Sequence, residues 1–236
     1  MITKDEFATL TYKLNIKFND PKLLSRAFIH RSYLNEIKSN LSSNERMEFL
    51  GDSVLSLVVS LHLFTSREND TEGDLTNLRA YIVKTKSLAQ AAKSLDLGKY
   101  LKLSKGEEVS GGRENIQLLA NSYEALLGAI FLDQGLEAVQ KVIKNTLFVI
   151  FEKEIKSGPP QDAKSQLQEF VQEQHKISPN YKILGTRGPD HAKVFTVAVF
   201  WDNKEYGRGT GPSKQDAEEQ AAVGAIRKID SKIKLV

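Results

Sequence analysis

Cysteine is absent from the 236-residue sequence, which excludes disulfide bonds and thiolate metal sites and fits a reducing compartment. Histidine is also scarce, with four residues that show neither paired metal-ligand spacing nor a nucleophilic triad: His30, His62, His175 and His191. Any metal site in this chain would therefore be built from oxygen ligands, which favours Mg²⁺ or Mn²⁺ over zinc.

Long hydrophobic runs and a strong charge of one sign are missing too. No apolar run approaches the length of a membrane span, and the first residues, MITKDEFATLTYKL, lack the pattern of a signal peptide. We therefore expect a cytoplasmic protein without a membrane partner. The net charge is only +3, with 21 basic and 20 acidic residues up to Gly158 and 12 and 10 after it. Because neither half is strongly basic, binding to a polyanion would depend on local clusters of charge.

A row of acids marks the stretch from Asn44 to Leu55, which reads NERMEFLGDSVL. Glu45, Glu48 and Asp52 are spaced i, i+3 and i+7, so on a helix they fall within about 60° of arc. Repulsion makes such a row costly unless positive charge lies against it, and a divalent metal ion is the natural candidate. An ordinary solvated face would show the same spacing. An apolar stripe on the other side of the helix is expected to face the core: Met47, Leu50, Val54, Leu57, Val58 and Leu61.

Phe49 argues against the solvated alternative. It lies about 40° round the helix from Glu45, between the acids and the solvent side and away from the apolar stripe. A large aromatic side chain at that position has no place in its own core, so we expect it to contact another surface. The acid row with Phe49 beside it predicts a site at an interface.

A second candidate lies in the apolar segment 116–132, IQLLANSYEALLGAIFL, whose strong polar groups are Asn121 and Glu124. Their i, i+3 spacing places both on one face of a helix too apolar to be exposed all round. A buried carboxylate is costly without a cation, a donor or a metal, although a hydrogen-bonded core glutamate is the simpler alternative. Together with Glu48 and Asp52, these residues predict two helices that present oxygen ligands to one site.

The hydrophobic pattern changes once along the chain. Helical spacing occurs throughout the first part, where we recognise no convincing strand. The segments expected to be helical are 4–14, 21–28, 45–66, 74–94, 116–132 and 135–154, with loops at 35–43 and 104–113. Lys156-Ser157-Gly158-Pro159-Pro160 can extend neither a helix nor a central strand. We therefore expect an all-α domain over residues 1–156, a linker over 157–161 and a second domain over 162–231.

The second domain alternates between helical and extended patterns. A helix is expected over 162–174, strands over 181–186, 194–201 and 205–209, and a closing helix over 213–229. This α-β-β-β-α order makes a small α+β domain. Gly211-Pro212-Ser213-Lys214 starts the last helix with a lysine in its first turn, an arrangement suited to holding phosphate.

Both parts resemble known families. NERMEFLGDSVL is similar to the signature of the ribonuclease III family, whose members cut double-stranded RNA. Further similar segments are His30-Arg31-Ser32-Tyr33, Glu72-Gly73-Asp74 and Leu119 to Leu126. Residues 162–231 resemble a double-stranded-RNA-binding domain, through Leu167-Gln168-Glu169, Gly188-Pro189-Asp190-His191, Phe195-Thr196-Val197, and the Gly-Pro-Ser-Lys turn followed by Asp216-Ala217-Glu218.

The resemblance implies roles for particular residues. Asp52 and Glu124 would be catalytic, and the metal ligands would be Glu48, Asp52, Asn121 and Glu124. Glu45 and Glu72 would line the same cleft, and Phe49 would contact the second subunit of a homodimer. RNA contacts would come from Gln168, Gln172, His191, Ser213 and Lys214. Asn121 departs from the family, which usually has Asp there; its carbonyl oxygen can coordinate a metal but brings no charge.

The implied reaction is Mg²⁺-dependent hydrolysis of double-stranded RNA, with Mn²⁺ as a substitute and no small-molecule cofactor. It would leave 5′-phosphate and 3′-hydroxyl ends and a short 3′ overhang, in the processing of ribosomal RNA precursors and other structured RNAs. The alternative is a protein of the same fold that binds double-stranded RNA without cutting it. Asn121 is the only residue that supports this alternative.

Overall fold

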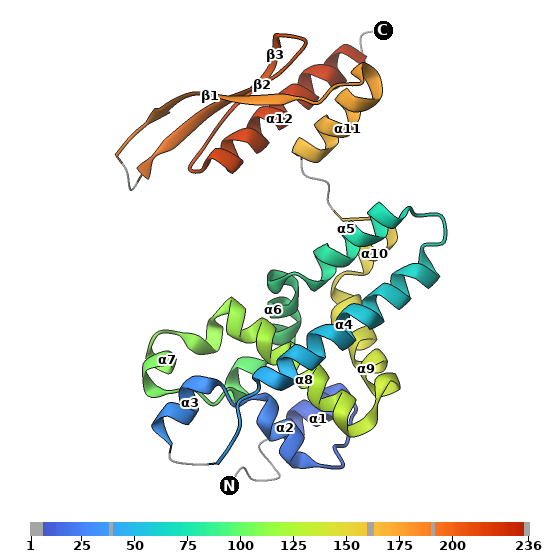
Figure 1. The fold of residues 1–236 in the computed structure, drawn as a ribbon, viewed down its shortest axis with the longest axis vertical. Helices are drawn as coiled ribbons and strands as arrows, with labels where there is room; N and C mark the ends of the chain where they lie inside the picture. The colour runs from blue at the N-terminus through green and yellow to red at the C-terminus, as the bar shows by residue number, and fades with distance from the viewer. Residues whose placement is uncertain (1–6, 38–39, 160–162, 190–191, 234–236) are drawn as a thin grey trace. The chain divides into compact units, whose positions relative to one another are not determined.

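The structure, a computed structural model, describes residues 7–37, 40–159, 163–189 and 192–233 (Figure 1). The chain divides between Pro159 and Pro160 into two compact units. The described part of the first unit is helical apart from short connections, whereas the second contains a sheet and two helices. The predicted fold class, an all-α domain followed by a small α+β domain, is confirmed.

The helices of the first unit follow one another closely. Their bounds are Ala8–Leu14 (α1), Pro21–Ala27 (α2), Arg31–Glu36 (α3), Glu45–Ser66 (α4), Glu72–Val83 (α5), Thr85–Ser94 (α6), Lys105–Val109 (α7), Ile116–Gln134 (α8), Leu136–Ile143 (α9) and Glu152–Ser157 (α10). Short 3₁₀ turns cover Leu97–Tyr100 (η1) and Gly112–Glu114 (η2), and a π-helical segment covers Lys144–Phe148 (η3).

The core of this unit forms around α8, which packs against α2, α4, α6 and α9 (Figure 1). Tyr123 on α8 is fully buried, and its hydroxyl group is hydrogen-bonded to Thr146 Oγ1 in η3 at 2.7 Å. Thr146 in turn donates to the carbonyl oxygen of Val142. This chain of hydrogen bonds satisfies the buried hydroxyl groups and holds η3 against α8.

One prediction about α4 was wrong. Met47, Val54 and Val58 are buried as expected, but Leu57 is 54% exposed and Leu61 is 45% exposed. The buried residues on the adjacent part of the helix surface are instead Leu55, Val59 and Leu63. The buried face is therefore rotated towards the acid row, and an apolar strip remains exposed on the far side.

Several boundaries also differ from the predicted ones. The helix expected over 74–94 is divided at Lys84, whose backbone is extended, so that α5 and α6 each direct apolar residues into the core. The segment 104–113, expected as a loop, contains α7, where Ser104 caps the helix by accepting from the N–H of Glu107 at 3.2 Å. Ser104 and Glu107 have the spacing of a capping box, the signal that could have predicted this helix. The segment expected as one helix over 135–154 is divided into α9, η3 and the start of α10.

The second unit is a three-stranded antiparallel sheet in the order β1-β2-β3, with two helices on one face (Figure 1). Its elements are Ala163–His175 (α11), Asn180–Arg187 (β1), Val194–Trp201 (β2), Lys204–Gly211 (β3) and Lys214–Ile233 (α12). Gly207 and Gly209 on β3 face α12, where a Cβ atom on either would overlap the backbone of Ala221. These glycines let the strand and the helix approach closely, so the alanines of α12 complete the core.

Candidate active site

Gly51 on α4 and Gly128 on α8 bring the backbones of these two helices into contact. A Cβ atom on Gly51 would overlap the carbonyl oxygen of Glu124, and one on Gly128 would overlap that of Met47. Only glycine permits so close an approach of two helices. Asp52 is adjacent to Gly51, and Glu124 lies one turn before Gly128. The crossing therefore brings the acids of the two helices together.

An asparagine lies at the start of each of these two helices. The buried amide of Asn44, the N-cap of α4, donates to the carbonyl oxygen of Ala27 at 3.1 Å. Asn115, the N-cap of α8, accepts hydrogen bonds from the N–H groups of Gln117 and Leu118. Asn115 thus caps α8 and sets where that helix begins, whereas Asn44 ties the start of α4 to the end of α2.

Burial and mutual repulsion dominate the electrostatics of the acids. Burial, with smaller contributions from Asp52 and Glu48, raises the pKa of Glu124 to about 7. Burial also raises the pKa of Glu48, as do Glu45 and Asp52, while a hydrogen bond from Asn121 acts in the opposite direction. Both shifts mean that negative charge at this crossing lacks compensation.

The donor set is suited to a hard divalent cation. Glu48, Asp52 and Glu124 repel one another, and no Lys, Arg or His of the described residues forms an ion pair with them. In the described part of the chain, no three Asp, Glu or His side chains lie close enough together to hold a metal ion as they stand.

The Asn121 amide is held in a defined orientation. Its Oδ1 accepts a 2.7 Å hydrogen bond from Gln117 Nε2. Its hydrogen bond to Glu48 lowers the pKa of that carboxyl group, so the amide nitrogen must be the donor towards Glu48. In this structure Asn121 thus directs N–H, and not its carbonyl oxygen, at the neighbouring acid.

A pocket of about 320 Å³ opens beside these groups. It is lined by His30, Arg31, Asn44, Glu45, Glu48, Leu101, Gln117, Leu118 and Asn121, whereas Asp52 and Glu124 lie outside its lining. The sequence had not predicted a place in the site for His30, Arg31, Asn44 or Gln117. The feature that could have indicated a fixed position for His30 is its place directly before α3, where its ring caps the helix.

The two further acids predicted for the cleft lie in different places. Glu45 is in the pocket, where Ser43 Oγ donates to it at 2.8 Å and Arg31 lies 3.8 Å away. Glu72 starts α5, beyond the opposite end of α4. A helix rises 1.5 Å per residue, so the 18 residues from Glu48 to Ser66 span about 27 Å. Within one chain the structure does not bring Glu72 to the other acids.

Phe49 points away from the core and is 78% exposed. Leu57, Leu61 and Phe64 continue the exposed apolar strip along α4, with Phe64 70% exposed. These four residues are named the α4 face below. Among the described residues α4 alone has the length and apolar composition of a membrane span, which is weak support for one because core helices can share these properties.

The residues predicted to contact RNA lie on both helices of the second unit. Gln168 and Gln172 are exposed on α11, and Gln172 Nε2 donates to Ser178 Oγ at 3.3 Å. Ser213 caps α12 by accepting from the N–H of Asp216 at 3.1 Å, and the exposed Lys214 follows it. His191 lies outside the described residues.

Comparison with known proteins identifies both units. Residues 20–150 match the family model described as Ribonuclease-III-like. Residues 163–229 match the model of the double-stranded RNA binding motif. The chain belongs to the ribonuclease III family. It is therefore a nuclease, and the family supports endonucleolytic cleavage of double-stranded RNA.

Curated members of the ribonuclease III family match over nearly the whole chain. Ribonuclease 3 of Desulforamulus reducens is 43% identical over 98% of this chain and 94% of its own. Ribonuclease 3 of Chloroflexus aggregans is 45% identical over 96% of this chain and 99% of its own. Because the match includes both units, the order of nuclease domain and RNA-binding domain is that of these relatives.

Solved nuclease domains of ribonuclease III from Campylobacter jejuni have a similar fold. One is 39% identical, with a TM-score of 0.58, and covers 62% of this chain and 99% of its own. That protein is described as flexible in a region involved in dimer formation.

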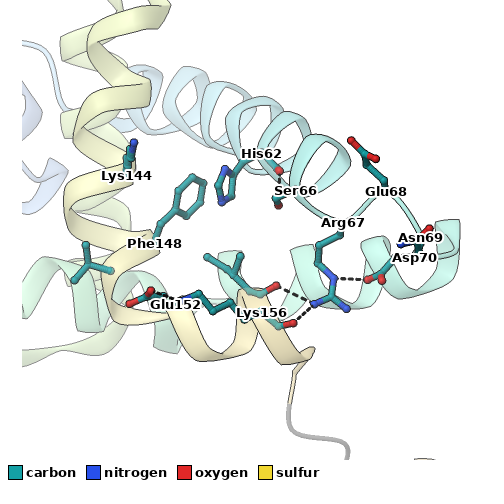
Figure 2. Close-up of a pocket in the computed structure, with 12 residues that line it drawn as sticks. His62, Ser66, Arg67, Glu68, Asn69, Asp70, Lys144, Phe148, Glu152 and Lys156 are labelled. Atoms are coloured by element: carbon teal, nitrogen blue, oxygen red, sulfur yellow. Dashed lines mark hydrogen bonds and ion pairs between the residues drawn. The ribbon is translucent and has the colours of Figure 1, made fainter.

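A larger pocket of about 760 Å³ lies at the other end of α4 in this ribonuclease III-family chain. Figure 2 shows Arg67 forming an ion pair with Asp70 and hydrogen bonds with the carbonyl oxygens of α10, while His62 stacks on Phe148 with ring centroids 4.2 Å apart. Lys156, on the same wall, pairs with Glu152. Since most of its charged groups neutralise one another, this pocket has no cluster comparable to the acids of α4 and α8.

Proposed function

We propose that this ribonuclease III-family protein hydrolyses double-stranded RNA in a Mg²⁺-dependent reaction, with Mn²⁺ able to replace Mg²⁺. The products would carry 5′-phosphate and 3′-hydroxyl ends with a short 3′ overhang. The observation that carries this proposal is the group of carboxylates without a counter-charge at the crossing of α4 and α8, where burial and then Asp52 and Glu48 raise the pKa of Glu124 to about 7. A site that binds a divalent cation requires this excess of charge.

Glu48, Asp52 and Glu124 are the groups that would hold the metal. The chemistry that bound Mg²⁺ supplies is a lowered pKa of its coordinated water and neutralisation of charge on the phosphate. Glu124 must lose its proton to act as a ligand, so metal binding and proton release are coupled. Asn121 would turn its amide to offer Oδ1, or would remain a donor that stabilises the charged form of Glu48.

We propose a homodimer assembled through the α4 face. Phe49 lies near the start of α4 and Phe64 near its end, and both are exposed. A two-fold axis that pairs two such helices in opposite directions would place the end of one beside the start of the other. Glu72, remote from Glu48 within one chain, would then approach the acids of the partner subunit. This arrangement would let one cleft contain both sites, each cutting one RNA strand.

The second unit would hold the duplex by its shape, across minor grooves and phosphates. Gln168, Gln172, Ser213 and Lys214 are exposed on α11 and around the start of α12, where they can reach RNA. His191 is proposed for the same role. The substrates would be ribosomal RNA precursors, messenger RNAs and other structured RNAs in the cytoplasm.

The test uses a labelled RNA duplex incubated with the full-length protein in Mg²⁺, in Mn²⁺ and in EDTA. Cleavage in either metal and none in EDTA is expected, with end analysis showing 5′-phosphates. The variant Glu124→Gln should bind the duplex almost normally, because affinity comes mainly from phosphate contacts elsewhere, and should not cut it. Duplex binding without cleavage by the unaltered protein would instead support a non-cleaving RNA-binding protein.

A further inference from the structure

His30 is held in the wall of the acidic pocket by two contacts. As the N-cap of α3, its Nδ1 accepts a hydrogen bond of 3.3 Å from the backbone N–H of Ser32. The hydroxyl group of Ser32 lies 2.8 Å from the same nitrogen and accepts a hydrogen bond of 3.1 Å from the N–H of Ser104. The ring is therefore oriented by α3 and by the segment that leads into α7.

These contacts determine where the proton of the ring resides. A backbone N–H can only donate, so Nδ1 of His30 must be an unprotonated acceptor, and the proton of the neutral ring is on Nε2. Burial, more than any other factor, lowers the pKa of His30; Arg31 lowers it as well, whereas Glu107 and Glu45 raise it. Within the described residues, Nε2–H has no hydrogen-bond partner.

This proton position excludes one role for His30 and leaves another. A metal ligand needs an unprotonated nitrogen, and Nδ1 is occupied by Ser32. Moving the proton to Nδ1 would place it against the N–H of Ser32 and remove the cap of α3. His30 is therefore a fixed donor in a pocket whose other lining includes Glu45, Glu48 and Asn121.

We propose that the Nε2–H of His30 donates to a non-bridging oxygen of an RNA phosphate in the cleavage site. This inference rests on the proposed function. A phosphate that approaches Glu45 and Glu48 meets negative charge, so donors on another part of the pocket wall reduce the repulsion. Arg31, adjacent to His30 and also in the pocket lining, adds a guanidinium group. His30 contributes a neutral donor with a defined direction, and Arg31 contributes positive charge.

Two substitutions separate the donor from the cap. Asn is a good N-cap residue, so His30→Asn should keep the hydrogen bond to Ser32 N–H while removing Nε2–H. His30→Ala removes both. If the donor contacts substrate, both variants should lose cleavage on the order of 100-fold, with duplex affinity unchanged, and only His30→Ala should lose thermal stability. Wild-type cleavage by His30→Asn would overturn the proposal.

A modified substrate tests the contact itself. Sulfur is a weak hydrogen-bond acceptor, so a phosphorothioate at the scissile position should weaken the contact in one of its two stereoisomers. The loss caused by His30→Asn should then be largely absent for that stereoisomer and present for the other, measured by single-turnover cleavage in Mn²⁺. Equal losses on all substrates would show that His30 does not contact a non-bridging oxygen. If the unaltered protein cuts no duplex in Mg²⁺ or Mn²⁺, the proposed function itself fails and this inference fails with it.

Discussion

The side-chain amide of Gln117 donates a hydrogen bond of 2.7 Å to Oδ1 of Asn121. One turn of α8 separates the two residues, and Asn121 meets Glu48 with its other end. Position 121 is thus occupied by a neutral group whose orientation depends on a neighbour. This relationship leads to a prediction about the metal requirement.

Asn121→Asp should shift the Mg²⁺ titration of cleavage to lower concentration, because a carboxylate adds charge to the site. Duplex affinity should change little. In the unaltered protein Mn²⁺ should support cleavage at lower concentration than Mg²⁺, since Mg²⁺ demands near-ideal octahedral geometry and gives up its water reluctantly. Calorimetric titration of the protein with Mn²⁺ measures the same difference without RNA. Coincident titrations of the two proteins would refute a role for charge at position 121.

Gln117→Met provides a control for this prediction. It removes the hydrogen bond to Asn121 with little change in size. If Gln117 acts by orienting the Asn121 amide, Gln117→Met should alter the Mn²⁺ affinity of the protein that has Asn121. An aspartate at position 121 needs no such orientation, because its two oxygens are equivalent. The same change made in the Asn121→Asp protein should then leave affinity as it is.

Gly51→Ala should destabilise the nuclease domain strongly. The added methyl group overlaps the backbone carbonyl group of Glu124, which cannot rotate away, so α4 and α8 must separate. A cost of about 1–3 kcal/mol or more in the free energy of unfolding is expected for such overpacking, measured by urea denaturation. Cleavage should fall as well, because the same crossing brings the acids together.

Gly106→Ala is the matched control. Gly106 lies in α7 with no atom within 4 Å of its added Cβ, so the substitution should be neutral or stabilising by about 0.5–1 kcal/mol. If both variants show the same stability, close packing at Gly51 is not what holds the two helices.

Metal-free protein should lose stability as the pH rises through the titration of Glu124. Its usual pKa is 4.5 and its pKa in the folded chain is about 7, because of burial and then of Asp52 and Glu48. Between these values the folded state binds more protons than the unfolded state, so the free energy of unfolding falls as the pH rises and remains lower above pH 7. Urea denaturation in EDTA from pH 4.5 to 8 measures this change.

Glu124→Gln should be less sensitive to pH over that range, since the amide does not titrate there. Its stability should exceed that of the unaltered protein at pH 8 in EDTA. Mg²⁺ should reduce this difference in the free energy of unfolding, because it should stabilise only the protein that has the Glu124 carboxylate. A pH dependence identical in both proteins would mean that Glu124 is charged throughout.

Phe49→Ala should weaken a dimer without unfolding the subunit. Phe49 is 78% exposed in the single chain, so its truncation should change subunit stability by less than about 0.5 kcal/mol. Sedimentation at several concentrations should show a shift towards monomer. Tyr12→Ala is the control, because Tyr12 is also exposed, at 87%, but lies on α1 and outside the α4 face. An unchanged monomer–dimer equilibrium would contradict the proposed interface.

Local rules were sufficient for much of this protein. The extended, largely apolar pattern of 194–201 predicted β2 at its observed bounds, and the strand expected over 205–209 lies within β3, because a strand pattern depends on neighbours in sequence. The spacing of Glu45, Glu48 and Asp52 defined the acid row before any packing was known, since the angles between residues of one helix are constant. The change from helical to mixed pattern near Pro159 likewise marked the second unit.

Other features depended on contacts between distant segments. The angles between residues of one helix do not show which face becomes the core. Leu57 and Leu61 were predicted to be buried but are exposed, because α8 packs against the side of α4 that carries Gly51. The raised pKa of Glu124 comes first from burial in the packed domain and then from Asp52 and Glu48 on another helix. The Ser32 hydroxyl group beside the His30 ring is held by the N–H of Ser104, 72 positions later in the chain than Ser32. The residue types present are set by the sequence, but their distances, burial and protonation follow from tertiary packing.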